Sequence, residues 1–230
     1  MKKINLLLLT TLISVASYSQ HTMGTTTGTS TAPAATHTRM TSFGLDVGAN
    51  FSRFNIDREK FPTGTTAPDA DYSTSFHVGV FLEIPVGGMF SLKPQVIYSR
   101  QGAEITQGTG TTAVKYDEDL DYIYVAPAAV QITTPAGFIV ESGPQLGFLI
   151  SAEQERGTTK TDVKDIRNKV DFLWNAGIGY MTKLGFGVHA RYNHGFSNVL
   201  STSDDNTRNA NGKMSNRLFQ LGVMYHFGKH

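Results

Sequence analysis

Apolar and polar residues alternate one by one along the chain from Phe43 onward. In the first stretch, Leu45 and Val47 are interleaved with Asp46 and Gly48. Successive side chains of a β-strand point to opposite faces, so this pattern predicts strands with one apolar face and one polar or bare face. Eight such segments, each about 10 to 13 residues long, are expected. They cover residues 43–52, 76–84, 90–99, 122–131, 138–150, 170–180, 184–196 and 218–227.

The connections between these segments alternate strictly between short and long. Residues 86–88, 133–136 and 182–183 form short links, whereas the long links cover residues 55–73, 101–118, 151–169 and 197–215. All four long loops therefore project from the same end. This arrangement is typical of outer-membrane barrels, whose strands need about 9 to 11 residues to cross the hydrocarbon. The sequence predicts an all-β fold, an eight-stranded antiparallel up-and-down transmembrane β-barrel with four long extracellular loops, short periplasmic turns and both termini in the periplasm.

Glycine and charge on one face of the segments predict which side is the interior. An eight-stranded barrel is just wide enough inside for side chains, which favours small residues there. The glycines on this face are at positions 44, 48, 79, 143, 147, 177, 179, 185, 187, 195 and 222. Aromatic residues near the segment ends suit the girdles at the membrane interfaces. They are Phe43, Phe90, Tyr122, Phe138, Tyr180, Tyr192, Phe196, Phe219 and Phe227.

Two soluble folds remain as alternatives to a membrane barrel. An exported lipocalin-like barrel would place the apolar faces inward around a ligand. A β-sandwich would bury the same aromatic residues in an ordinary core between two sheets. The small and charged face argues against the lipocalin arrangement, and the edge strands of a sandwich would need protection that a closed barrel does not.

The N-terminal residues carry a targeting signal. Residues 1–20 have a basic start at Lys2 and Lys3, an apolar stretch and small residues at Ser17 and Ser19, so they predict a cleaved secretory signal peptide rather than a core helix. Residues 21–40 are rich in Thr, Gly and Ala and predict a flexible tail, because they offer little apolar surface to bury. Residues 41–230 are expected to form the barrel domain.

Composition excludes several classes of function. The 230-residue chain has no Cys, so disulfide scaffolds, zinc fingers, thiol nucleophiles, iron–sulfur clusters and a lipoprotein anchor are ruled out. The formal net charge of +1 provides no electrostatic basis for binding nucleic acid. No cofactor and no metal site are expected.

Charged residues on the predicted interior face form a candidate lumen charge network. Buried charges must be paired and hydrogen-bonded, so we expect Lys93 and Arg191 to bridge Glu83 and Glu141 and to plug the barrel. A narrow gated pore is the alternative. The predicted network consists of Asp46, Glu83, Lys93, Glu141, Arg191 and His189, and the same face also carries His77 and Asp171.

The sequence does not favour an enzyme. Small outer-membrane barrel enzymes use Ser, His and an acid, or Asp and His, but the residue two positions after His194 on the same face is Phe196. Ser197 falls on the other face, so a proton relay to a nucleophile has no geometry. No catalytic residue is predicted.

Two acidic stretches in the expected loops lack calcium-binding spacing. They contain Asp117, Glu118 and Asp119 in one loop and Asp204 and Asp205 in another. Oxygen-rich clusters can bind Ca²⁺, but neither stretch has the spacing of an EF-hand. Solvated loop charge is therefore the favoured interpretation.

Several motifs recur along the predicted strands, at residues 44–52, 122–127, 177–180, 190–198 and 221–227. They resemble those of the PorT-like outer membrane β-barrel family of Gram-negative bacteria, within the small barrels of the OmpA type. The resemblance implies an outer-membrane location, and one named member of the family is linked to protein secretion. The last segment, which ends on Phe227, also looks like the signal that the barrel-assembly machinery reads during insertion.

The expected function is that of a non-enzymatic integral outer-membrane protein with a side-chain-filled lumen. It would serve envelope structure, surface interaction or a secretion-accessory role. The expected partners are outer-membrane lipid and lipopolysaccharide, the barrel-assembly machinery, and a surface or secretion-system protein, without nucleic acid. The alternatives are a small pore or uptake component and, with less support, a barrel-embedded lipid- or peptide-processing enzyme.

Overall fold

The computed structural model describes residues 40–57, 68–108, 110–200 and 213–227. All of them belong to one compact unit, Arg39–His230. The expected signal peptide at residues 1–20 and residues 21–39 of the expected tail lie outside the described residues. Among the described residues, no helix has the length and apolar character to cross a membrane.

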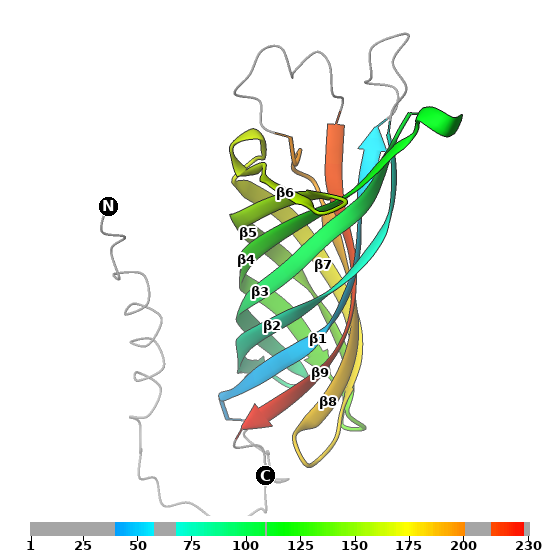
Figure 1. The fold of residues 1–230 in the computed structure, drawn as a ribbon. Coiled ribbons are helices and arrows are strands. Elements are labelled where there is room, and N and C mark those ends of the chain that lie inside the picture. Colours follow the sequence, from blue (N-terminus) through cyan, green and yellow to red (C-terminus); the bar gives the residue numbers. More distant parts are fainter. Residues whose placement is uncertain (1–39, 58–67, 109, 201–212, 228–230) are drawn as a thin grey trace, which may run out of the picture. The chain divides into compact units, whose positions relative to one another are not determined.

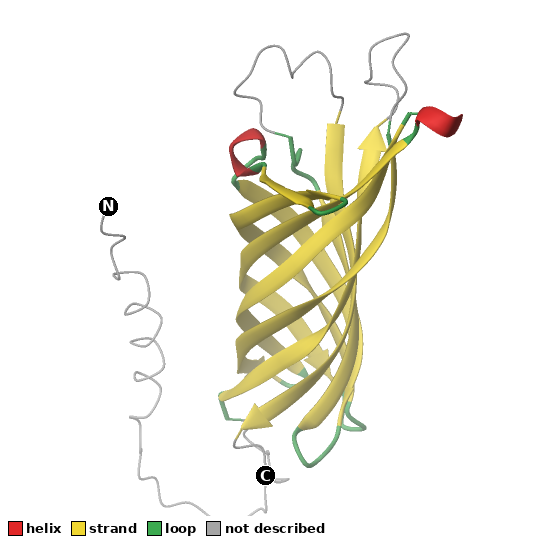
Figure 2. Cartoon of the chain, viewed as in Figure 1, coloured by secondary structure: helices red, strands yellow, loops and turns green. Residues whose placement is uncertain are grey.

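Eight long strands form a closed antiparallel ring, as the sequence predicts (Figure 1). The ring closes because β1 pairs with both β2 and β9, and β4 pairs with both β3 and β5. Two short 3-10 turns, Gly110–Thr112 and Lys164–Ile166, provide the helix in the described residues (Figure 2). The strands are β1 (Ser42–Asp57), β2 (Asp69–Gly87), β3 (Phe90–Gln107), β4 (Val114–Thr133), β5 (Phe138–Arg156), the short β6 (Thr159–Asp162) that pairs with the end of β5, β7 (Val170–Met181), β8 (Phe186–Gly195) and β9 (Lys213–Phe227).

An apolar belt surrounds the ring. Val47, Val188 and Val223 lie side by side on β1, β8 and β9 and are about half exposed, whereas Asp46 and Arg191 are buried inside. This orientation is the reverse of a lipocalin-like barrel, and the closed ring is not a sandwich. We define the apolar belt as the outward-facing residues within 43–51, 76–84, 90–98, 123–132, 138–150, 170–180, 186–196 and 219–227.

Strand β4 differs from the predicted pattern. Tyr122 and Tyr124 were expected to face outward, with Tyr122 in an aromatic girdle, but both are fully buried in the lumen. Ala126 and Ala129 both point inward, and the pairing of β4 with β5 shifts register between Val125 and Val130. A bulge reverses the phase of a strand because it adds residues without advancing the pairing. The uninterrupted period of two assumed from the sequence was therefore wrong in this strand.

The strands also continue far beyond the expected loop boundaries. Residues 101–118 were expected to form a loop, yet β3 runs to Gln107 and β4 begins at Val114. Outward-facing residues in this extension include the charged Glu104, Lys115 and Asp117. At about 3.3 Å per residue and a tilt of about 40°, the hairpin projects about 20 Å past the belt. The segment expected to be a loop is therefore partly strand. Residue polarity alone does not distinguish a solvated strand from a loop.

The position of the belt predicts the effect of a charge placed in it. Val223→Arg is expected to lower the free energy of unfolding by about 2–4 kcal/mol, because Arg at the midplane of a lipid-facing strand must lose its hydration. Thr74→Arg is the matched control. Thr74 pairs with Phe51 at the outer edge of the belt, so its change is expected to be at most about 1 kcal/mol. Urea titration of the barrel in lipid vesicles measures both, and equal effects would contradict the proposed belt.

Candidate functional site

The lumen charge network brings together five residues from four strands. Asp46 lies on β1, Lys93 on β3, Glu141 on β5, and His189 and Arg191 on β8. All five are at most 5% exposed. The strand period places each of these side chains inside, and the curvature of the ring then brings strands that do not neighbour each other within reach across the lumen.

Arg191 is the centre of this network. Its Nη1 donates to Asp46 Oδ2 at 2.5 Å, and its Nε donates to Glu141 Oε1. Lys93 Nζ donates to Glu141 Oε2 at 2.9 Å, and His189 Nε2 lies 2.7 Å from Asp46 Oδ1. Two cations therefore hold two carboxylates in one connected group. Such pairing is the condition under which buried charges are tolerated.

Glu83 belongs to an adjacent pair. It was expected to accept from Lys93 or Arg191, but Ser91 Oγ donates to its Oε1 at 3.1 Å and His226 Nδ1 lies 3.2 Å from its Oε2. The ring of Phe81 connects the two groups. Lys93 Nζ lies 4.5 Å from its centroid, and the His226 ring lies 4.7 Å away. His226 is therefore a lumen residue that the sequence-based network did not include.

Asp171 lies in a separate polar contact. Tyr124 Oη donates to Asp171 Oδ2 at 3.1 Å, and Asn216 Nδ2 donates to the same oxygen at 2.6 Å. Asp171 therefore joins the side chain of Asn216 to Tyr124, which also belongs to a cluster of buried apolar residues.

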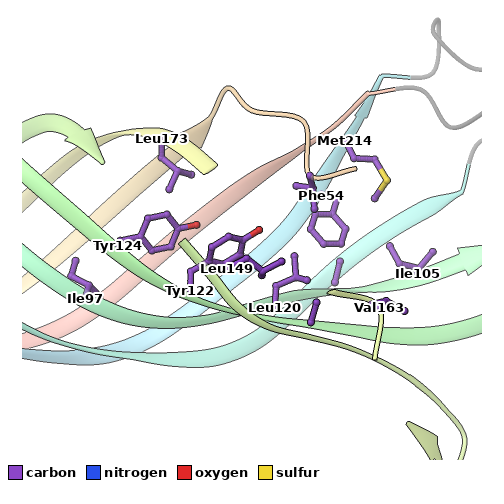
Figure 3. Close-up of a cluster of buried hydrophobic side chains, with 13 residues drawn as sticks. Phe54, Ile97, Ile105, Leu120, Tyr122, Tyr124, Leu149, Val163, Leu173 and Met214 are labelled. Atoms are coloured by element: carbon purple, nitrogen blue, oxygen red, sulfur yellow. The ribbon is translucent and has the colours of Figure 1, made fainter. Parts of the chain in front are cut away.

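A cluster of buried apolar side chains, which we call the apolar plug, lies inside the barrel (Figure 3). Tyr122 and Tyr124 stack at 5.3 Å between ring centroids and are surrounded by aliphatic side chains. Sequence reasoning missed this plug, although the segment at residues 122–131 is apolar on both faces and signals burial on both. The plug consists of Phe54, Ile97, Ala103, Ile105, Leu120, Tyr122, Tyr124, Leu149, Ala152, Val163, Leu173, Val199 and Met214.

Connecting segments cover the outer end of the plug. Arg167 donates from Nε and Nη2 to the two carboxylate oxygens of Glu118 at 2.5 and 2.6 Å. Burial alone would lower the pKa of Arg167, but the hydrogen bonds to Glu118 raise it above its ordinary value. Asn168 N donates to Val199 O at 2.8 Å. The segments that follow β6 and β8 are thereby joined over the barrel mouth.

The acidic stretch on β4 is part of the sheet, which corrects its assignment to a loop. Glu118 is buried against Arg167, and Asp119 accepts from Arg100 at 2.7 Å. Asp117 is exposed. Partial burial raises its pKa, and the carboxylates of Glu104, Asp119 and Glu155 raise it further. Asp204 and Asp205 lie outside the described residues.

His194 and Ser197 occupy different environments. The His194 ring lies 4.8 Å from that of Phe196 and 6.3 Å from that of Tyr192. Ser197 Oγ accepts from Phe172 N at 2.8 Å. His77, which the sequence placed on the interior face, lies beside Asp46 and His189. The possible ligand atoms of these three residues are all within 4.8 Å of one another.

A family model described as an outer membrane protein β-barrel domain matches residues 18–201. A search of curated proteins gave no match. Similar solved structures include the attachment invasion locus protein Ail of Yersinia pestis, at 15% identity over 82% of this chain and 100% of that chain, with a TM-score of 0.44. Neisserial surface protein A is 10% identical over 82% and 100%, with a TM-score of 0.48. The outer membrane protein AlkL is 12% identical over 89% and 97%, with a TM-score of 0.41. Identities this low say nothing about a shared role.

The lumen charge network predicts a large effect of removing its central cation. Arg191→Met is expected to lower the free energy of unfolding by about 3–5 kcal/mol, because it leaves buried carboxylates with one cation between them. Arg100→Met removes a partly exposed cation from Asp119 and is expected to cost at most about 1 kcal/mol. Denaturant titration in detergent compares the two. Equal losses would show that the lumen screens charge as the surface does.

Proposed function

Because the chain belongs to the outer membrane protein β-barrel domain family, we propose that it is a closed, non-enzymatic outer-membrane barrel that acts through its extracellular projection. The short turns face the periplasm and the long hairpins face the exterior. The role is to present a rigid surface for interaction at the cell envelope, with lipopolysaccharide around the belt and a surface or secretion-system protein as a further partner.

The observation that carries this proposal is the double filling of the lumen. The charged layer around Arg191 occupies one level, and the apolar plug around Tyr122 occupies the next. A solute crossing the barrel would have to separate buried ion pairs and then displace packed aromatic side chains. Both steps are costly, so transport through the lumen is disfavoured.

The PorT-like resemblance refines this proposal toward secretion. The extended hairpin of β3 and β4 carries paired charges on its outer surface, such as Arg100 with Asp119 and Lys115 with Glu104. A sheet of this kind offers a stiff polar platform to a protein partner. Strand β9 ends on the aromatic residue Phe227, which supports recognition by the barrel-assembly machinery before the ring closes. In the closed ring, Phe227 stacks on Phe43 at 4.6 Å between ring centroids.

A small pore is the second candidate, and one observation favours it. Several buried side-chain atoms in the lumen lack a hydrogen-bond partner among the described residues, including Gln95 Nε2 and Oε1, Gln145 Nε2, and Asn175 Nδ2 and Oδ1. Buried polar groups of this kind are normally satisfied by internal water. A hydrated lumen is a precondition for conduction.

Planar-bilayer recording distinguishes the two candidates. The wild-type barrel is expected to give no stable channel, because two layers of side chains obstruct it. Tyr122→Ala hollows the apolar plug alone and is expected to stay closed, since the charged layer persists. A stable open channel in the wild-type protein that Arg191→Ala abolishes or widens would contradict the closed-lumen proposal.

An arginine pair at the outer edge of the belt supports contact with lipopolysaccharide phosphates. Arg53 on β1 and Arg217 on β9 are direct partners in register, next to the aromatic pair Phe51 and Phe219. Arg217 Nη1 donates to Gly195 O at 2.8 Å and to Asn216 O at 3.0 Å. Like charges opposite each other on a sheet repel, and a bound phosphate relieves that repulsion.

The double variant Arg53→Gln, Arg217→Gln is therefore expected to bind lipopolysaccharide several-fold more weakly than the wild type. The affinity of the detergent-folded barrel for fluorescent lipopolysaccharide, measured at low and high salt, is the readout. Arg100→Gln is the control, because Arg100 already pairs with Asp119. An unchanged affinity in the double variant would remove this pair from the proposed contact.

A further inference from the structure

Two histidines on strands that are not neighbours approach each other on the inner wall of the barrel. His77 on β2, Gly48 on β1, Gly222 on β9 and His189 on β8 form one row in register. The ends of a row of four strands lie about 14 Å apart along a sheet. The two imidazole rings are nevertheless only 5.9 Å apart between centroids. The side chains lean toward each other over the two glycines.

The glycines provide the room for this approach. A Cβ at position 48 would lie 2.7 Å from His77 Cε1, and a Cβ at position 222 would lie 2.8 Å from His189 Cε1. Contacts this short would force the rings away. The His-Gly-Gly-His row, which runs across four strands, therefore holds two imidazoles together in a buried position.

The hydrogen bonds of Asn50 determine which nitrogen of His77 carries its proton. Asn50 Nδ2 donates to Phe76 O at 2.9 Å and Arg100 O at 2.7 Å, so the amide orientation is set. Asn50 Oδ1 must then accept from His77 Nδ1, 2.8 Å away. In a neutral imidazole with a proton on Nδ1, Nε2 carries a lone pair.

That lone pair has no hydrogen-bond partner among the described residues, although His77 is fully buried. Nε2 faces Asp46 Oδ1 at 3.6 Å, which is too long for a hydrogen bond. His189 Nε2 approaches the same oxygen at 2.7 Å. Two imidazole nitrogens and a carboxylate oxygen thus converge on one point. His77 Nε2 and Asp46 Oδ1 are both acceptors there, and they repel each other unless a cation lies between them.

We propose that Asp46, His77 and His189 bind one divalent first-row transition metal ion, with Zn²⁺ or Co²⁺ as suitable occupants. Two ligands held about 2.0–2.1 Å from a tetrahedral ion lie about 3.3 Å apart. The distances of 3.6 and 2.7 Å from Asp46 Oδ1 to the two nitrogens bracket this value. The ion takes the lone pair of His77 Nε2. Neutral His189 carries one ring proton, which shifts from Nε2 to Nδ1, so that the Nε2 lone pair binds the ion and no net proton is released.

The surrounding charges decide how tightly the ion is held. Arg191 Nη1 holds the other oxygen of Asp46 and repels a cation, whereas Glu141, which is bonded to Arg191, attracts one. The hydrogen bond from Arg191 therefore orients the Asp46 carboxylate, as hydrogen bonds to metal-binding carboxylates usually do. Two imidazoles and one carboxylate leave coordination positions open, and this donor set suits Zn²⁺, Co²⁺ or Fe²⁺ better than Ca²⁺ or Mg²⁺.

Metal titration of the full barrel in detergent, without a histidine tag, tests the proposal. Co²⁺ is expected to bind one ion per chain with the visible absorption of low-coordinate cobalt, and Zn²⁺ is expected to displace it. His77→Gln and His189→Gln each remove one of three ligands and are expected to weaken binding by about 100-fold or more, since losing only a hydrogen-bond partner of a ligand already costs about 10- to 100-fold. Heat-modifiable migration on unboiled gels confirms that each variant is folded before it is titrated.

His226→Gln is the matched control, because His226 is buried in the same lumen but pairs with Glu83. Its affinity for Co²⁺ is expected to stay within a few-fold of the wild type. Absence of cobalt binding to the folded wild-type barrel would overturn the proposal. Binding that survives both His77→Gln and His189→Gln would also overturn it, since the ion would then be held elsewhere on the chain, for example by His21, His37 or His230.

Discussion

Closure of the hydrogen-bonded ring is the constraint on which the rest of this structure depends. A lipid bilayer offers no hydrogen bonds to the backbone, so every N–H and C=O group within it must pair inside the protein. The pairing of β1 with β9 and of β4 with β5 removes the two free edges that the sheet would otherwise have. With eight strands in the ring, the radius is small, and every inward side chain meets others across the lumen.

The crowded lumen has two layers, one stabilised by ion pairs and the other by apolar packing. Near the short turns, charges are tolerated because Arg191 and Lys93 each contact a carboxylate directly. Toward the outer end, Tyr122 and Leu120 belong to a packed core of the kind found in soluble domains, closed by the buried pair of Arg167 and Glu118. Part of this packed core lies level with the belt, since Leu149 is flanked along β5 by the outward-facing Phe148 and Ile150.

The sequence predicted the fold because the period of two is a local property. Val47 outside and Asp46 inside follow from alternation alone, and the same holds for Val223 and for Arg191. The prediction failed for Tyr122, since a bulge between Val125 and Val130 adds residues to one strand without adding them to its partner. It also failed for strand length, because charged residues such as Glu104 suit a solvated strand as well as a loop.

The amino-acid order alone therefore established the number of strands in the ring, the inward or outward direction of most residues and the presence of charges in the lumen. It did not establish their partners. Arg191 meets Asp46 rather than Glu83, and His77 meets His189, because ring closure and register select which strands face one another. Alternation is read within one strand, whereas these contacts join residues more than 100 positions apart. Only the closed tertiary structure brings them together, and it does so through backbone pairing that no side chain specifies by itself.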